Sequence, residues 1–130
     1  MTFKNVNEVK NWLRNINIVK GELKLKIKFY KELEEEFGET AGFESSVKFY
    51  KNQVEELQEK LKRLISDTDR LFSLLDENER LVMTARYINM IRWDYIELHV
   101  YYSRRQAIRV HDGALLKLVG QTVGELNDEQ

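Results

Sequence analysis

The chain of 130 residues contains no cysteine, no proline and only six glycines. Without cysteine, disulfide frameworks, thiolate zinc sites and cysteine nucleophiles are excluded. Because proline and glycine are the residues that most often interrupt helices, their scarcity favours long, unbroken helices. Apolar and polar residues nowhere alternate for long between turn signals, so a sheet is not expected. The chain is therefore predicted to be all-α.

Long hydrophobic runs are also missing. No segment approaches the ~20 apolar residues of a membrane span, and the N-terminus lacks the apolar run of a signal peptide. A cytosolic protein with no membrane partner is expected. The net charge is only −1, and the charged residues, 33% of the chain, are mixed in sign. Most dedicated DNA-binding domains are visibly basic, so the overall charge does not by itself indicate a nucleic-acid partner.

Residues that carry catalysis or bind metals are sparse. His99 and His111 lie on different expected elements, and neither has a serine or carboxylate arranged around it. Three consecutive acidic residues, Glu34 to Glu36, point in different directions on a helix and do not converge on one ion. We therefore expect no enzyme, no catalytic residues, no metal site and no cofactor.

Two apolar stripes at helical spacing occupy the N-terminal part of the chain. Between them, residues 38–43 include two glycines suited to a helix end and a turn. The second stripe alternates steps of three and four, which is typical of a coiled-coil seam. Residues 1–75 are therefore predicted to form a long helical hairpin with coiled-coil character, whose seams also permit a homodimer. The first stripe is Ile16, Val19, Leu23, Ile27, Tyr30, Leu33 and Phe37, and the second is Val47, Tyr50, Val54, Leu57, Leu61, Leu64, Thr68, Leu71 and Leu75.

Residues 76–119 show the pattern of three short helices. Asp76 and Glu79 form a capping-box signature, with an acceptor for unpaired amides and a carboxylate three residues later. A short second helix is expected over residues 93–98. The first helix presents an apolar face made of Leu81, Val82, Ala85, Tyr87 and Ile88.

The third helix is predicted to begin after Ser103, because Ser103 and Gln106 form a second capping-box signature. One side of this helix is apolar and is expected to pack on the first two helices. The opposite side presents guanidinium groups within the first two turns, where a recognition helix in the major groove of DNA needs them. The apolar side comprises Ala107, Val110, Ala114, Leu115 and Leu118, and the outward side comprises Arg104, Arg105 and Arg109.

Three motifs within residues 79–118 carry a resemblance to a known family. They are the pair Arg86-Tyr87, the W-x-x-I pattern that starts at Trp93 and the YSRR sequence that starts at Tyr102. This block resembles the region-4 helix-turn-helix of sigma-70-type factors. More closely, it resembles the ArpU-like, sigma-factor-like late transcription regulators of phages and prophages of Gram-positive bacteria. Outside this block the chain agrees with that family only in its general organisation.

The resemblance implies a phage or prophage DNA-binding transcription regulator in the cytoplasm of a bacterial host cell. Its implied partners are double-stranded DNA and RNA polymerase. Four positions depart from the pattern. Glu97 stands where a small residue is usual, and Tyr101 stands where the turn usually has glycine. Arg92 stands where an oxygen-bearing N-cap is expected, and Ile108 stands where an arginine often contacts phosphate. The DNA-binding positions that the motif implies are Tyr102, Ser103, Arg104, Arg105, Gln106 and Arg109.

Two other functions remain open from the sequence. A DNA-packaging adaptor of the small-terminase kind also joins a helix-turn-helix to helical oligomerisation elements, and a protein-interaction or antagonist module can use the same scaffold. Only residues 103–117 are locally basic, so DNA affinity is expected to be weak and strongly salt-dependent without dimerisation or tethering. Residues 120–130 are acidic and lack an apolar stripe, which predicts a flexible tail.

Overall fold

The computed structural model describes residues 1–124, and within them it contains helices and no strand, which confirms the all-α prediction. The chain divides into two compact units. The hairpin unit is Ile18–Arg63, and the terminal unit combines Met1–Asn17 with the chain from Leu64 onward. The domain boundary therefore differs from the one expected at residue 75. The helices are α1 (Val6–Leu13), α2 (Asn15–Phe37), α3 (Glu44–Phe72), α4 (Glu77–Met83), the π-helical η1 (Thr84–Ile88), the 3₁₀-helical η2 (Trp93–Leu98) and α5 (Arg104–Leu118).

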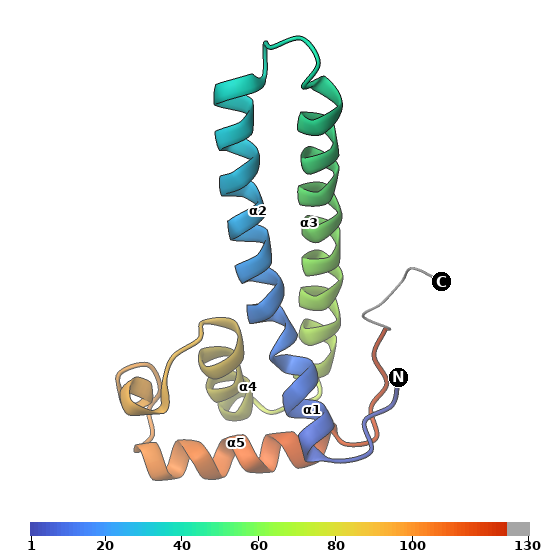
Figure 1. Ribbon diagram of the computed structural model, residues 1–130. Coiled ribbons are helices and arrows are strands. Elements are labelled where there is room, and N and C mark those ends of the chain that lie inside the picture. Colours follow the sequence, from blue (N-terminus) through green and yellow to red (C-terminus); the bar gives the residue numbers. More distant parts are fainter. Residues whose placement is uncertain (125–130) are drawn as a thin grey trace. The chain divides into compact units, whose positions relative to one another are not determined.

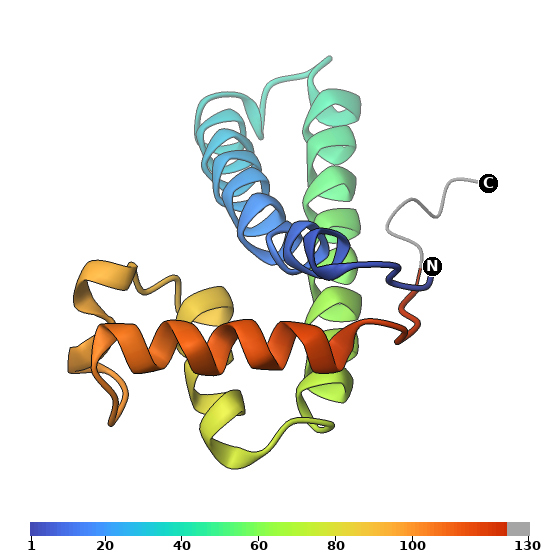
Figure 2. The same cartoon turned by 90° about the horizontal axis from the view of Figure 1, so that it is seen from below.

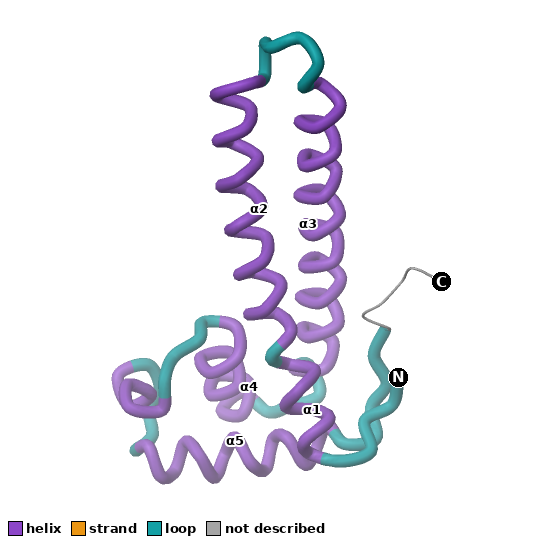
Figure 3. Tube along the Cα trace, in the orientation of Figure 1, coloured by secondary structure: helices purple, strands orange, loops and turns teal. Residues whose placement is uncertain are grey.

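The hairpin unit is the predicted pair of antiparallel helices (Figures 1 and 3). The turn between α2 and α3 contains Gly42 in the left-handed region with a φ of 96°, a conformation that glycine adopts without steric cost. Phe37 stacks on Phe43 across this turn, with ring centroids 4.6 Å apart. Within this unit the predicted stripes face inward, with Val19 and Val54 buried and the other members half-buried. Two helices alone leave much of each seam partly open, because neither has a third helix to cover it.

A break that the apolar stripes do not indicate separates α1 from α2 at Arg14. The side-chain amide of Asn15 donates hydrogen bonds to the carbonyls of Asn11 and Trp12, at 3.1 and 3.0 Å. Asparagine side chains that bond to nearby backbone groups compete with regular helical hydrogen bonds. As a result, α1 forms a separate helix that packs against α5 in the terminal unit.

The segment that follows α5 lies against the N-terminus. Phe3 donates its amide to the carbonyl of Gln121 at 3.0 Å, and Gly120 donates to the carbonyl of Phe3 at 2.8 Å. Thr2 and Thr122 form an isolated antiparallel bridge, and Val123 is buried. The prediction of a flexible tail is therefore wrong for residues 120–124, because backbone pairing and one buried valine hold them. The rest of that predicted tail, residues 125–130, lies outside the described residues.

No helix within residues 1–124 combines the length and the apolar character that a membrane crossing requires.

Candidate nucleic-acid interface

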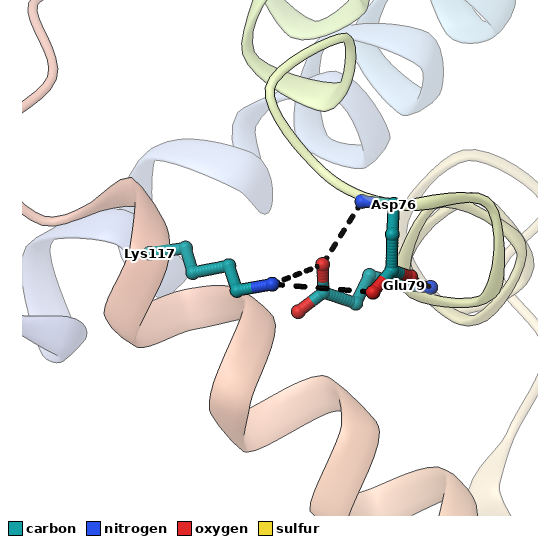
Figure 4. Close-up of polar contacts among 3 residues, drawn as sticks. All are labelled: Asp76, Glu79 and Lys117. Carbon is teal, nitrogen blue, oxygen red and sulfur yellow. Dashed lines mark hydrogen bonds and ion pairs between the residues drawn. The ribbon is translucent and has the colours of Figure 1, made fainter.

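The start of α4 is fixed by the predicted capping box. Glu79 donates its amide to Asp76 Oδ1 at 2.8 Å, and Asp76 donates its amide to Glu79 Oε1 at 2.9 Å. Glu79 is buried, and Lys117, in the last turn of α5, donates to the same Oε1 at 2.8 Å (Figure 4). The hydrogen bond to Glu79 raises the pKa of Lys117, and the Glu79 amide lowers the pKa of Asp76. This contact fastens the C-terminal end of α5 to α4, so Lys117 has a structural role.

The chain leaves α4 through the single π-helical turn η1. Its wider ring is closed by a hydrogen bond of 2.9 Å from the Asn89 amide to the Thr84 carbonyl. Met90 then adopts a left-handed conformation with a φ of 58°, which is uncommon for a residue other than glycine. Both Ala85 and Tyr87 are buried within this turn. The π-turn therefore ends the first helix and directs Tyr87 into the core of the terminal unit.

The short helix η2 occupies the residues predicted for the second helix, and Ile96 is its one buried residue. Ile96 is fully buried, at 0% exposure, whereas Leu98 of the same helix is 80% exposed. Ile96 belongs to a core cluster that joins α4, η1, η2 and α5. The cluster consists of Val82, Ala85, Ile96, Val100 and Ala107, with Leu81, Ile91, Trp93, Tyr102 and Val110 packed against it.

The start of α5 is capped twice. The predicted capping box is present, because Gln106 donates its amide to Ser103 Oγ at 3.2 Å and Ser103 donates its amide to Gln106 Oε1 at 3.3 Å. Glu97 adds a second cap, since its Oε1 accepts the amide of Arg104 at 2.7 Å. A carboxylate at this position stabilises the positive end of the helix dipole. The helix start is thus held by protein groups, and Ser103 and Gln106 have capping roles.

The three outward arginines of α5 differ in their surroundings. Arg104 forms an ion pair of 3.3 Å with Asp94, and Asp94 also pairs with Arg92 at 3.5 Å. Arg105 and Arg109 are exposed and form no ion pair with any described residue. Because they are four residues apart, they lie on the same side of the helix. In Figure 2 α5 lies in front of α4.

Aromatic residues beside the helix start are arranged differently from the prediction. Tyr102, predicted to contact DNA, is half-buried and packs against the core cluster. Tyr101 is 96% exposed, and the neighbouring helix η2 adds the exposed Tyr95 and Leu98. The exposed tyrosine hydroxyls can donate to phosphate oxygens. Tyr101 is therefore the more accessible of the two tyrosines for such a contact.

His111 is buried on the inward side of α5, in a network that the sequence did not indicate. Its Nε2 lies 2.7 Å from the hydroxyl of Tyr87, and its Nδ1 lies 3.0 Å from Oδ1 of Asp112. Trp93 meets the imidazole edge to face with ring centroids 5.0 Å apart, and Arg86 lies over the Trp93 ring. With Nδ1–H donated to the carboxylate, Nε2 accepts a hydrogen bond from the tyrosine hydroxyl. The neutral imidazole thus links α5 to both η1 and η2.

Burial lowers the pKa of His111 from its usual 6.5, although the hydrogen bond to Asp112 opposes this effect. The folded state therefore favours the neutral imidazole, and the unfolded chain takes up the proton first as the pH falls. We expect the free energy of unfolding to be fully retained above about pH 6.5 and to decrease as the pH falls below it. Urea unfolding monitored by circular dichroism between about pH 5 and 7 measures this slope.

His111→Asn is expected to flatten that part of the profile, because an asparagine side chain does not titrate. His99→Gln is the matched control, since His99 is exposed. A slope that persists after His111→Asn and disappears after His99→Gln would contradict this assignment.

No family model, curated protein or solved structure matches the chain. The interface is therefore defined by geometry alone. The structure brings five of the predicted positions together at the start of α5, as Ser103, Arg104, Arg105, Gln106 and Arg109, while Tyr102 turns toward the core. Sequence reasoning missed Asp94, Glu97 and His111, each of which has a partner on another element. The local signal for Asp94 and Glu97 was that two acidic residues lie three positions apart on a short helix just before the Ser103 cap.

Proposed function

We propose that the terminal unit binds double-stranded DNA through the outer side of α5. The observation that carries the proposal is the pair Arg105 and Arg109, exposed and without acidic partners among the described residues, on a helix capped at its start and braced from behind. A guanidinium group on a helix of this kind can bond guanine in the major groove or a phosphate of the backbone. Along the chain, η1, η2 and α5 follow one another as the helices of a helix-turn-helix unit do.

The bracing of α5 supports this use. Lys117 holds the C-terminal end of the helix on Glu79, Ala107 packs in the core cluster near its start, and His111 bonds to Tyr87 between them. Three contacts spread along one side fix the direction in which the opposite side points. Preorganised contact groups lose less conformational entropy on binding. The buried residues of α5 thus position the exposed ones.

Within this proposal, the finer function is that of a phage or prophage transcription regulator, cytoplasmic in a bacterial host, that acts with RNA polymerase. The charge of the interface supports a tethered or dimeric protein. Asp94 pairs with two of the local arginines, which leaves Arg105 and Arg109 as the unpaired cations on α5 near its start. Two or three phosphate contacts give only weak non-specific affinity at physiological salt. A second copy or a DNA-bound partner raises the effective concentration.

A second candidate, a protein-interaction module, is favoured by one observation. Tyr95, Leu98 and Tyr101 are exposed beside the start of α5, and exposed aromatic side chains near arginine are enriched at protein interfaces. The same residues can support a contact with RNA polymerase beside DNA. A packaging adaptor of the small-terminase kind would form a ring, so the number of subunits in solution separates it from a regulator.

Titration of a fluorescent random-sequence duplex at low salt tests the proposal. The logarithm of the association constant is expected to fall with the logarithm of the salt concentration, with a slope of about −2 to −3. Asp94→Asn frees Arg104 and Arg92 from their shared carboxylate. We expect this variant to bind several-fold more tightly and to steepen the slope by about one.

Glu77→Gln is the matched control, because it removes one exposed negative charge from the start of α4 instead of from the arginines. Equal gains in the two variants would show a general charge effect and no role for the arginines beside Asp94. A chain that binds no duplex at low salt would contradict the proposed function itself.

A further inference from the structure

The hairpin unit has one exposed apolar side. Ile18, Leu25 and Phe29 of α2 are exposed, at 53, 70 and 44%, and their spacing of seven and four residues places them along one side of the helix. Phe49 of α3 is 56% exposed. Tyr50 meets both Phe29 and Phe49 edge to face, with ring centroids 4.8 and 5.3 Å apart. The two helices therefore contribute to one surface, the apolar face, defined as Ile18, Leu25, Phe29 and Phe49.

A different side of the hairpin unit is charged. An open groove near the turn is lined by residues of both helices, including Glu34, Lys48, Lys51 and Glu55. A hydrogen bond from Tyr30 to Glu34 raises the pKa of the tyrosine hydroxyl at this groove. The charged side of the two-helix hairpin is therefore suited to contact with solvent. The apolar face, by contrast, holds four large side chains that a solvated two-helix hairpin has no reason to expose together.

The charge of the hairpin unit is also divided along its length. Residues 32–47, around the turn, contain six glutamates and no lysine or arginine. Residues 18–31 contain five lysines and one glutamate, and residues 48–63 contain five basic and three acidic residues. The end of the hairpin that bears the turn is therefore acidic, and the remainder is basic. Two such hairpins attract each other in the antiparallel direction and repel each other in the parallel one.

We infer that the apolar face is an interface with a second copy of this chain, in which the two hairpins pack antiparallel as a four-helix bundle. The acidic turn region of each copy lies against the basic part of the other, so the contact is self-complementary under two-fold symmetry. Leu25, Phe29 and Phe49 lie near the two-fold axis, and Ile18 of each copy lies toward the acidic end of its partner. The inference is independent of the proposed DNA binding.

The size of the surface sets the strength of the dimer. The helical segments of the hairpin unit are about 30 Å long, and two packed helices are about 20 Å wide. One face then offers about 600 Å² per copy, at the lower limit for a stable interface. We expect a dissociation constant in the micromolar range, measured by sedimentation equilibrium of the full chain.

Paired substitutions test the face. Leu25→Ser with Phe49→Ser removes two exposed side chains from the apolar face, and is expected to raise the dissociation constant at least about thirtyfold with unchanged helical content. Lys51→Ser with Glu55→Ser changes the charged side, leaves the net charge unaltered and is expected to have no effect. A wild-type chain that stays monomeric at about 0.5 mM, or an equal loss in both double variants, would overturn the inference.

Charge reversal tests the orientation. Glu32→Lys with Glu36→Lys reduces the negative charge of the acidic end, and Lys28→Glu with Lys60→Glu reduces the positive charge of the basic part. In an antiparallel dimer opposite charges face each other, so each pair weakens association at low salt, whereas in a parallel dimer like charges face each other and each pair strengthens it. Stronger association of either double variant at low salt would rule out the antiparallel arrangement.

A distance measurement gives the same answer independently. Because the chain has no native cysteine, Glu39→Cys in the turn accepts a single spin label. The two labels of an antiparallel dimer are expected about 35 Å apart, since each turn lies roughly twelve residues of helix from the two-fold axis. Labels closer than about 20 Å would show that the turns lie side by side in a parallel dimer.

Discussion

Replacing Arg105 and Arg109 together with alanine is expected to weaken duplex binding about a hundredfold at low salt. The two guanidinium groups are exposed on one side of α5, and neither forms an ion pair with a described residue. A good bidentate contact to a base is worth about 1–3 kcal/mol, so the loss of two accounts for this factor. Alanine favours helix, so α5 keeps its structure. Fluorescence anisotropy with a labelled duplex measures the change, and circular dichroism checks the helical content.

Arg104→Ala is the matched control for that experiment. Arg104 stands in the same first turn, but its guanidinium group already pairs with Asp94 at 3.3 Å. We expect its loss to reduce affinity by less than about threefold, because the charge removed was largely neutralised. If Arg104→Ala weakened binding as much as the Arg105 and Arg109 pair, the distinction drawn from Asp94 would be wrong. If the double variant bound normally, the outer side of α5 would not be the interface.

Ile96→Ala is expected to destabilise the terminal unit by about 2–5 kcal/mol. Ile96 is fully buried and is the one buried residue of η2, so its removal leaves a cavity between the first and third C-terminal helices. A 3₁₀-helix of six residues has little stability of its own and depends on this contact. Glu97 and Asp94 lie on the same short helix and contact Arg104. Loss of Ile96 therefore also disturbs the start of α5, and we expect weaker duplex binding.

Leu98→Ala supplies the control, since it removes a similar apolar volume from the same helix. Leu98 is 80% exposed, and its truncation is expected to change stability by less than about 0.5 kcal/mol. Chemical denaturation of the two variants gives both values. Equal losses would mean that η2 is not anchored through Ile96, and the account of how α5 is positioned would then fail.

The local features of this fold were predictable because short-range physics determines them. The capping boxes at Asp76 and Ser103 involve residues three positions apart, and both are present. The hairpin follows from two stripes that face inward around a turn containing Gly42. The six residues of η2 were also located from their sequence pattern, although its 3₁₀ form was not.

The remaining features depend on contacts between residues distant in sequence. The pairing of Phe3 with Gln121 holds a segment that composition alone marks as flexible. His111 meets Tyr87, 24 residues away, and an isolated histidine in a sequence gives no sign of such a partner. Asp94 changes the availability of Arg104 only because η2 brings the two side chains together. Local patterns thus located the candidate interface but did not show which of its arginines are unpaired.

A duplex is expected to contact the outer side of α5, and a chain of 15.6 kDa is small enough for its resonances to be followed during a DNA titration. The guanidinium Nε–Hε signals of Arg105 and Arg109, observed by ¹⁵N–¹H correlation spectroscopy, report the contact at the atoms concerned. We predict that both signals shift and that those of Arg63 and Arg80 stay in place. Unchanged signals of Arg105 and Arg109, with the duplex bound elsewhere or not at all, would contradict a DNA contact through the outer side of α5.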